Sequence, residues 1–216
     1  MRNEMNWLLR LSILTTIIQV TIKLAIAQSS PSPAFHPVQI SHSAEFDAPI
    51  DVIWIFFSRF DSISKWEKSL ISSCLVSKPF DKPYKSITGE CSIKHQGYTP
   101  VGSIRDLSVR DKHVYEQLIV LNPKEYRISY QQVKYPSSKL QLSPFPGLLI
   151  HKFTNVRLYS IGLNRTRAIW LADLRTDKPV EMYDAFHSVY TRAGQGIAET
   201  VRMFQANNIN AVQFLQ

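Results

Sequence analysis

The sequence predicts an α+β domain in which a curved antiparallel sheet of about seven strands wraps around a long C-terminal helix. Two observations lead to this fold class. Apolar residues recur with a period of two through much of residues 71–175, and several runs are joined by tight turns, as in an antiparallel meander. From Pro179 onward they recur at steps of three and four. A helix with one buried stripe packs in the concavity of such a sheet and leaves a cavity.

Residues 1–27 are predicted to be a signal peptide rather than part of the fold. A basic start precedes an apolar stretch that ends in the small-x-small triplet Ala25-Ile26-Ala27. We therefore expect cleavage between Ala27 and Gln28, and a secreted or periplasmic protein. An uncleaved membrane anchor is the alternative. Lys23 disfavours it, because a cation near the bilayer centre costs about 2.5–3.5 kcal/mol.

The remaining chain divides into a Ser- and Pro-rich tether at residues 28–37, one domain at 38–206 and a tail at 207–216. The formal net charge of +8 falls to +6 without the leader, which carries three cations and one anion. This charge is spread along the chain, without the basic run and interleaved aromatic residues typical of nucleic-acid binding. It favours a solvated basic surface, or loose attraction to anionic lipid or cell wall.

Two short helices are expected between the first strand, residues 38–46, and the rest of the sheet. Asp47 as a cap and Pro49 in the first turn mark the start of one helix, which continues with aromatic residues at helical spacing to Phe60. A second helical piece covers residues 62–70. Together they can close one end of the sheet.

The remaining strands are separated by two long connections, residues 78–100 and 135–147, and by three tight turns. The turns are marked by Arg110-Asp111, Asn122-Pro123 and residues 162–165. The predicted strands cover residues 71–77, 101–109, 112–121, 126–133, 148–160 and 166–175.

The C-terminal helix begins at Pro179, and one of its faces is apolar. The apolar face consists of Tyr183, Phe186, Tyr190, Ala193, Ile197, Val201 and Phe204. Gly194 and Gly196 interrupt this helix at a cost of about 1 kcal/mol each relative to Ala. Either these glycines allow another segment to approach the helix closely or they allow the helix to bend. The alternative is that the helix tolerates two glycines that have no specific role.

Two features depend on the compartment. Cys74 and Cys91 are the only cysteines, and in an exported chain without metal-type spacing they predict one disulfide. Two buried thiols are the alternative. Asn164 begins an N-glycosylation sequon, Asn164-Arg165-Thr166, within a predicted turn. The sequon has a function only in a source that has the glycosylation machinery.

The motifs that bind phosphate, dinucleotides or zinc are not found in the sequence. It contains no GxxxxGK[ST], GxGxxG, HExxH or CxxC, so no cofactor and no metal are predicted. The six histidines are dispersed, and we expect surface or packing roles for them. His187 could border the cavity, because it follows Phe186 on the C-terminal helix.

Arg105 and Glu116 form the strongest candidate site. If Arg110-Asp111 is a two-residue turn, the register places Arg105 directly opposite Glu116 on the inner face. That face also carries Ser103, Leu107, Val114 and Leu118. Arg105 would bind a carbonyl, a carboxylate or a developing oxyanion, and Glu116 would hold Arg105 or move a proton. The alternative is a structural ion pair that only fixes the strand register.

Several runs of residues resemble the START-type helix-grip (SRPBCC) superfamily across residues 38–206. This group includes polyketide cyclase/dehydrase and lipid-transport proteins, pollen-allergen-like proteins, plant abscisic acid receptors and lachrymatory factor synthase. The runs are Gly102-Ser103-Ile104-Arg105, Glu116-Gln117-Leu118, Leu121-Asn122 and Tyr126-Arg127-Ile128-Ser129-Tyr130. Further similar positions are Pro49, Trp54, Phe60, Trp66 and Trp170.

The resemblance implies a cavity for a small hydrophobic, lipid- or polyketide-like molecule. The ligand-binding residues would be Ser103, Arg105, Leu107, Glu116, Leu118, Trp170, Phe186 and Tyr190. In lachrymatory factor synthase an arginine and a glutamate at the corresponding positions carry catalysis. The second hypothesis for function is therefore a cyclase, dehydratase or isomerase that uses Arg105 and Glu116. The third hypothesis is a module used mainly for protein interaction.

Two departures from the family pattern bear on function. The short Arg110-Asp111 turn has no room for the gate loop of the hormone receptors, and the connection at residues 78–100 is long. A hormone-receptor function is therefore not expected. A second acid–base group beside the pair would favour an enzyme, and an otherwise apolar cavity would favour a carrier.

A Cys74–Cys91 disulfide is the first testable prediction. The bridge would close a loop of about 16 residues and stabilise the fold by about 3 kcal/mol in the chain-entropy model. Thiol labelling of the unfolded, unreduced protein should find no free thiol. Two labelled thiols per chain would rule out the bridge.

Overall fold

The computed structural model describes residues 35–77, 98–109, 112–133 and 147–207 together with Ile209. All of them lie in one compact unit, Phe35–Gln216. The elements are β1 (His36–Phe46), α2 (Ile50–Ser58), the 3-10 turn η1 (Ile63–Lys65), β2 (Ser72–Ser77), β3 (Ile104–Val109), β4 (Lys112–Asn122), β5 (Arg127–Gln132), β6 (Leu148–Gly162), β7 (Arg165–Thr176) and α3 (Pro179–Asn207). The predicted α+β class is confirmed.

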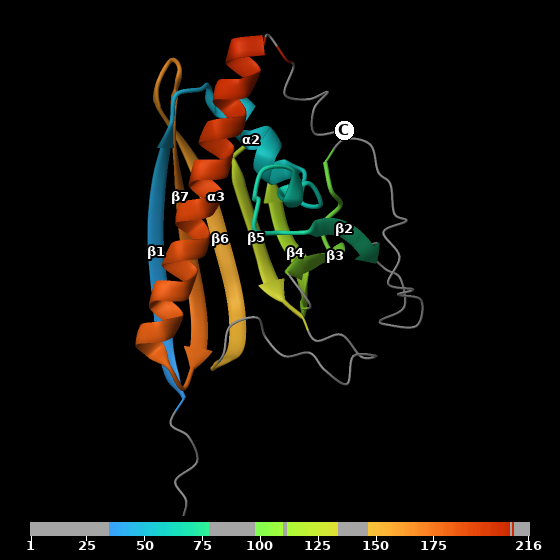
Figure 1. Cartoon of the computed structure of the whole chain (residues 1–216), viewed down its shortest axis with the longest axis vertical. Coiled ribbons are helices and arrows are strands. Elements are labelled where there is room, and N and C mark those ends of the chain that lie inside the picture. Colours follow the sequence, from blue (N-terminus) through green and yellow to red (C-terminus); the bar gives the residue numbers. More distant parts are fainter. Residues whose placement is uncertain (1–34, 78–97, 110–111, 134–146, 208, 210–216) are drawn as a thin grey trace, which may run out of the picture. The chain divides into compact units, whose positions relative to one another are not determined.

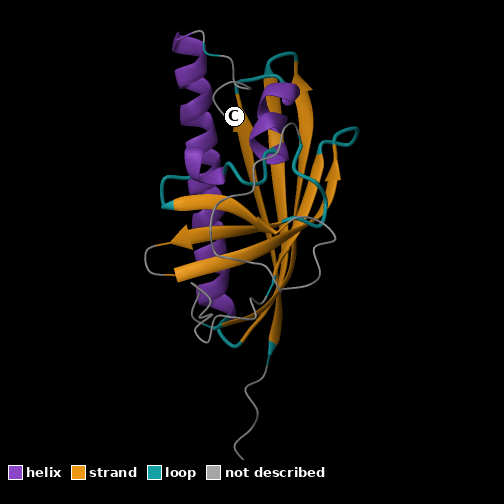
Figure 2. Ribbon diagram, turned by 90° about the vertical axis from the view of Figure 1, so that its right-hand side faces the viewer, coloured by secondary structure: helices purple, strands orange, loops and turns teal. Residues whose placement is uncertain are grey.

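The seven strands form one antiparallel sheet in the order β1-β7-β6-β5-β4-β3-β2. After β2 the strands follow chain order as a meander, and β1 adds to the far edge beside β7. Helix α3 runs along one face of the sheet and packs mainly against β1 (Figure 1). The sheet is so strongly twisted that the short strands at one end run almost across the long ones (Figure 2).

Three predicted boundaries are corrected by the structure. Asp47 is not the helix cap, because α2 starts after Pro49 and has no side-chain cap. The helical piece expected at residues 62–70 is only the turn η1, since Glu67 accepts hydrogen bonds from the backbone N and Oγ of Ser69 and holds the chain in a turn there. Strand β3 begins at Ile104 rather than at residue 101, because Gly102 has a φ of 93°.

The core lies between the inner face of the sheet, α2 and the apolar face of α3. Aromatic rings connect these layers: Phe56 of α2 stacks on Phe204 of α3, and Trp170 of β7 stacks on Tyr190 of α3. Tyr183, expected on the buried face of the helix, is exposed instead. It stacks on His187 at the surface.

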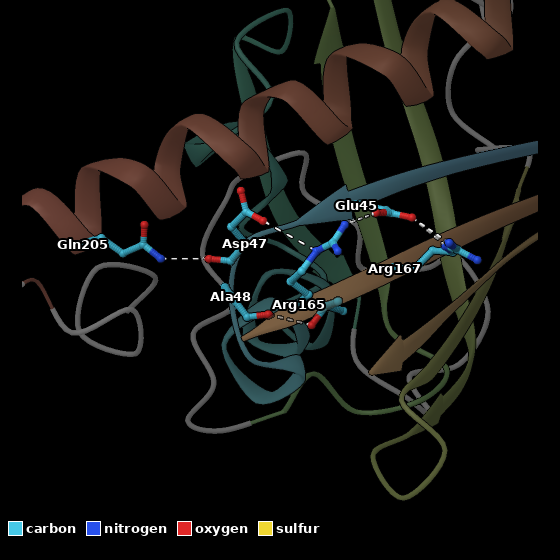
Figure 3. A network of polar contacts seen from close by, with 7 residues as sticks. Glu45, Asp47, Ala48, Arg165, Arg167 and Gln205 are labelled. Atoms are coloured by element: carbon cyan, nitrogen blue, oxygen red, sulfur yellow. Dashed lines mark hydrogen bonds and ion pairs between the residues drawn. The ribbon is translucent and has the colours of Figure 1, made fainter. Parts of the chain in front are cut away.

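A polar network ties the end of β1 to the β6–β7 hairpin and to α3 (Figure 3). Glu45 pairs with Arg165 and Arg167, each at 2.7 Å. The backbone oxygen of Asp47 accepts a hydrogen bond from Gln205 of α3, at 2.9 Å. These contacts join the chain just before α2 to the β6–β7 hairpin and to α3.

The sequon lies at this same corner. Asn164 is exposed in the turn between β6 and β7, whereas the hydroxyl of Thr166 is buried and donates to the backbone oxygen of Ala48 at 2.8 Å. Thr166 therefore has a structural role of its own. Among the cysteines, Cys74 lies on β2, while Cys91 lies outside the described residues, so the disulfide stays a prediction.

Gly196 explains how the chain after η1 can approach α3. A Cβ atom at this position would overlap the backbone oxygen of Trp66. At Gly194 an added Cβ would lie 3.1 Å from the Cβ of Ala44 on β1, which is tight but less severe. The structure thus supports close approach as the reason for these glycines.

We predict that Gly196→Ala destabilises the protein, although alanine is the better helix former by about 1 kcal/mol. The clash with Trp66 involves backbone, which cannot move aside cheaply, so the free energy of unfolding should fall by about 1–3 kcal/mol. Gln195→Ala, at the adjacent exposed position, is the control and should stay within about 0.5 kcal/mol. A variant that is more stable than wild type in urea unfolding would contradict the close approach.

Candidate functional site

A cavity of about 210 Å³ lies between α3 and the strands β3 to β6. Leu107, Val114 and Phe186 give it apolar walls, and Arg105, Glu116, Tyr130, His151, Thr154 and Tyr190 add polar groups. A smaller cavity of about 50 Å³ shares Arg105, Tyr130 and Tyr190 and adds Trp170. The space therefore combines apolar surface with a concentrated polar spot.

Arg105 and Glu116 are paired across β3 and β4 in the expected register. The Arg105 Nε and Nη2 atoms donate to Glu116 Oε2 at 2.9 and 2.5 Å, and both side chains are almost fully buried. Nη1 donates to the backbone oxygen of Phe60 at 2.5 Å. A guanidinium has five N–H groups, so one hydrogen on Nη1 and one on Nη2 have no acceptor among the described residues.

Aromatic rings flank the Arg105 guanidinium. Its central carbon lies 3.8 Å from the centre of the Phe60 ring and 5.1 Å from that of Tyr130. Such contacts stabilise a desolvated cation. They also hold the guanidinium plane in place, so its remaining N–H groups have a fixed direction.

A second polar group lies on β6 and α3. His151 Nε2 is 2.8 Å from the hydroxyl of Thr154, and that hydroxyl is 3.0 Å from the hydroxyl of Tyr190. All three side chains are buried. Tyr130 lies between this group and Arg105, because it pairs with Thr154 across β5 and β6 and its ring centre is 6.2 Å from that of His151.

Burial controls the protonation of this second group. It lowers the pKa of His151 from its ordinary value, and the nearby Glu116 charge opposes that effect. Burial also raises the pKa of both Tyr130 and Tyr190, with smaller contributions from neighbouring groups. At neutral pH the site therefore holds a neutral imidazole and two protonated phenols.

Glu67 and Arg192 lie at the edge of the larger cavity. Glu67 is buried and its Oε1 lies 3.9 Å from Nε of the exposed Arg192 on α3. The other carboxylate oxygen of Glu67 has no hydrogen-bond partner among the described residues. Ser69 also lines this cavity and is exposed, so the cavity reaches the protein surface here.

The structure brings most of the predicted ligand-binding residues to the cavities. Those on the larger cavity are Arg105, Leu107, Glu116, Phe186 and Tyr190. Trp170 lines the smaller one. Ser103 and Leu118 are fully buried but line neither of these two cavities, since Leu118 packs into the core and Ser103 lies before the start of β3.

Sequence reasoning missed Tyr130, Thr154 and His151. Tyr130 could have been found by extending the alternation from Ile128, a buried position two residues earlier on β5. His151 and Thr154 are three residues apart, and strict alternation would place them on opposite faces. An irregular register between His151 and Phe153 brings both to the inner face, and no local sequence signal marks it.

Two further properties concern the described residues alone. Among them, no group of histidine, cysteine, aspartate and glutamate side chains could hold a metal ion. In the same part of the chain, no helix is both long enough and apolar enough to cross a bilayer.

Comparison with known proteins finds similarity at the level of structure. The sequence matches no family model and no curated protein. A START superfamily protein from Mycobacterium smegmatis has a TM-score of 0.54 at 11% identity, over 77% of this chain and 98% of that chain. Ara h 8.0201 has a TM-score of 0.52 at 10% identity, over 79% and 99%.

Norcoclaurine synthase from Thalictrum flavum, solved in complex with dopamine and hydroxybenzaldehyde, is a third similar structure. Its TM-score is 0.50 at 15% identity, over 78% of this chain and 88% of that chain. At these identities the likeness concerns the fold. The chain has the START-type helix-grip fold that its sequence predicted.

We predict that His151 makes stability depend on pH below neutrality. Because its pKa is lowered in the folded state, the unfolded chain binds more protons below the ordinary value of 6.5, and stability falls as the pH falls through that range. His42, whose pKa is lowered by burial and by His187, contributes in the same window.

Urea unfolding of wild type and His151→Gln at pH 7.5 and 5.5 measures this effect. The variant should lose less stability than wild type between the two pH values, whatever its absolute stability. The remaining loss should shrink further in a double variant that also carries His42→Gln. Equal losses in wild type and His151→Gln would contradict the lowered pKa.

Proposed function

We propose that the protein binds a small hydrophobic molecule that carries an oxygen acceptor, and that Arg105 binds this oxygen. The observation that carries the proposal is the pair of Arg105 N–H groups that have no acceptor among the described residues, beside a cavity whose lining is otherwise largely apolar. A ketone, an aldehyde or a carboxylate would satisfy them with charge-assisted hydrogen bonds.

One of the similar structures supports this class of ligand. Norcoclaurine synthase was solved with dopamine and hydroxybenzaldehyde, both small and aromatic. The cavity here is lined by Phe186, Tyr130 and Tyr190, which offer ring surface to such a molecule. Native mass spectrometry of the protein purified from its source, with organic extraction, would identify what it carries.

Export remains part of the proposal. Residues 1–27 have the pattern of a signal peptide, so we expect the ligand to be bound outside the cytoplasm. N-terminal sequencing of the protein from its own cells should begin at Gln28. Intact Met1 on a cytoplasmic protein would contradict export, without affecting the proposed binding.

We predict that the double variant Arg105→Met with Glu116→Leu folds but loses affinity. Apolar side chains of similar volume often replace a buried ion pair without loss of stability, and the freed Phe60 carbonyl costs about 1–3 kcal/mol. The free energy of unfolding should therefore change by no more than about 3 kcal/mol. Losing the charge-assisted hydrogen bonds, worth about 1.5–3 kcal/mol, should weaken binding about 10- to 150-fold.

Binding is measured as displacement of 1-anilinonaphthalene-8-sulfonate fluorescence by 2-tetralone, a small bicyclic ketone. The matched control is Arg167→Met with Glu45→Leu, which removes an exposed pair of the same residue types, neither of which lines the cavity. The control should bind like wild type. Unchanged ketone affinity in the Arg105–Glu116 variant would show that this pair is only structural.

A further inference from the structure

The three buried groups Tyr190, Thr154 and His151 form a continuous hydrogen-bonded chain that binding alone does not require. The contacts are 3.0 Å from Tyr190 to Thr154 and 2.8 Å from Thr154 to His151. On the neighbouring strand β7, the inner-face positions between Thr166 and Thr176 are all apolar: Ala168, Trp170, Ala172 and Leu174. Burying three polar side chains is costly unless each is hydrogen-bonded, so their alignment at a cavity wall calls for an explanation.

The Tyr190 end of this hydrogen-bonded chain reaches the same cavities as Arg105. Tyr190 and Arg105 both line the larger cavity, and both also line the smaller one of about 50 Å³. A space of that size holds only a few atoms. One ligand carbonyl group can therefore contact the Arg105 N–H groups while a neighbouring carbon faces the Tyr190 oxygen.

We propose that the cavity is a proton-transfer centre that enolises a small hydrophobic ketone, with Tyr190 contacting the substrate and Thr154 and His151 completing a proton relay. The inference rests on the proposed function, because the ketone oxygen must first be bound by Arg105. It assigns the reaction class of an isomerase.

The step balances without a co-reactant. The C–H bond next to the carbonyl breaks, and its proton goes to the Tyr190 oxygen. The Tyr190 proton moves to Thr154, and the Thr154 proton moves to His151 Nε2. The electron pair of the C–H bond becomes a C=C bond, and the carbonyl oxygen becomes an enolate oxygen held by Arg105. Return of the proton to the same or a conjugated carbon restores every group.

The protonation states fit this direction of transfer. Burial keeps His151 neutral at pH 7, so its free ring nitrogen can accept a proton. Tyr190 retains its proton because burial raises its pKa, and it can therefore donate to Thr154 while it accepts from the substrate. The Glu116 charge near His151 favours the imidazolium that forms.

Hydrogen–deuterium exchange of 2-tetralone in D₂O, followed by proton NMR, tests the inference. Wild type should accelerate loss of the signals next to the carbonyl. Thr154→Val, which keeps the side-chain shape but removes the hydroxyl, and His151→Gln should each lower the rate at least about 100-fold, the scale of general acid–base catalysis. Their ketone affinity should stay within about threefold of wild type.

The matched control is Thr200→Val on α3, because Thr200 is buried but donates only to the Gly196 backbone oxygen. It should exchange like wild type. The wild-type rate should also fall as the pH drops below neutrality, where His151 becomes protonated, and the residual rate of Thr154→Val should not. Thermal melting identifies a variant that fails to fold, in which case His151→Gln decides.

The outcomes separate the two proposals. If wild type does not bind 2-tetralone, the proposed carbonyl binding by Arg105 fails, and the inference fails with it. If wild type binds the ketone without accelerating exchange, only the inference is overturned. Wild-type exchange in both Thr154→Val and His151→Gln would likewise overturn the relay while leaving ketone binding intact.

Discussion

The burial of one positive charge constrains much of this fold. Arg105 lies inside the sheet–helix layer, where an unpaired cation would be untenable. Glu116 on β4 neutralises it, which ties β3 to β4 in a single register. The carbonyl of Phe60 accepts a further hydrogen bond, so the chain after α2 must pass directly over the pair. A break in this arrangement on one side would cost about 3–5 kcal/mol.

The constraint also shapes the cavity. Helix α3 packs mainly against β1, at one edge of the sheet, and the Arg105 group lies on β3 and β4 toward the other edge. Helix and polar group therefore enclose a space instead of filling it. A carrier needs only such a space with one anchoring group. The second polar group on β6 and α3 adds acid–base residues to the same cavity, and the proposed proton transfer depends on them.

Local sequence signals predicted the order of the elements and the pairing of Arg105 with Glu116. Both depend on short-range properties: the hydrophobic period, and a two-residue turn that fixes every pair in the hairpin. The same signals failed where the backbone departs from regularity. The irregular register near His151 reverses which face its side chain occupies, and the positive φ of Gly102 shortens β3. Tertiary packing decides such departures, so the presence of His151 in the second polar group could not be predicted from periodicity.

The pairing of β1 with β7 has a consequence for how the chain acquires its structure. His36 pairs with Thr176 and Phe46 with Thr166, so the first strand finds its neighbour only after more than a hundred intervening residues. Contacts so distant in sequence form slowly, because a large loop must close first. On the ribosome, β1 emerges long before β7 exists. The β1 edge of the sheet therefore stays unpaired until β7 has left the ribosome, and the sheet can close only after that.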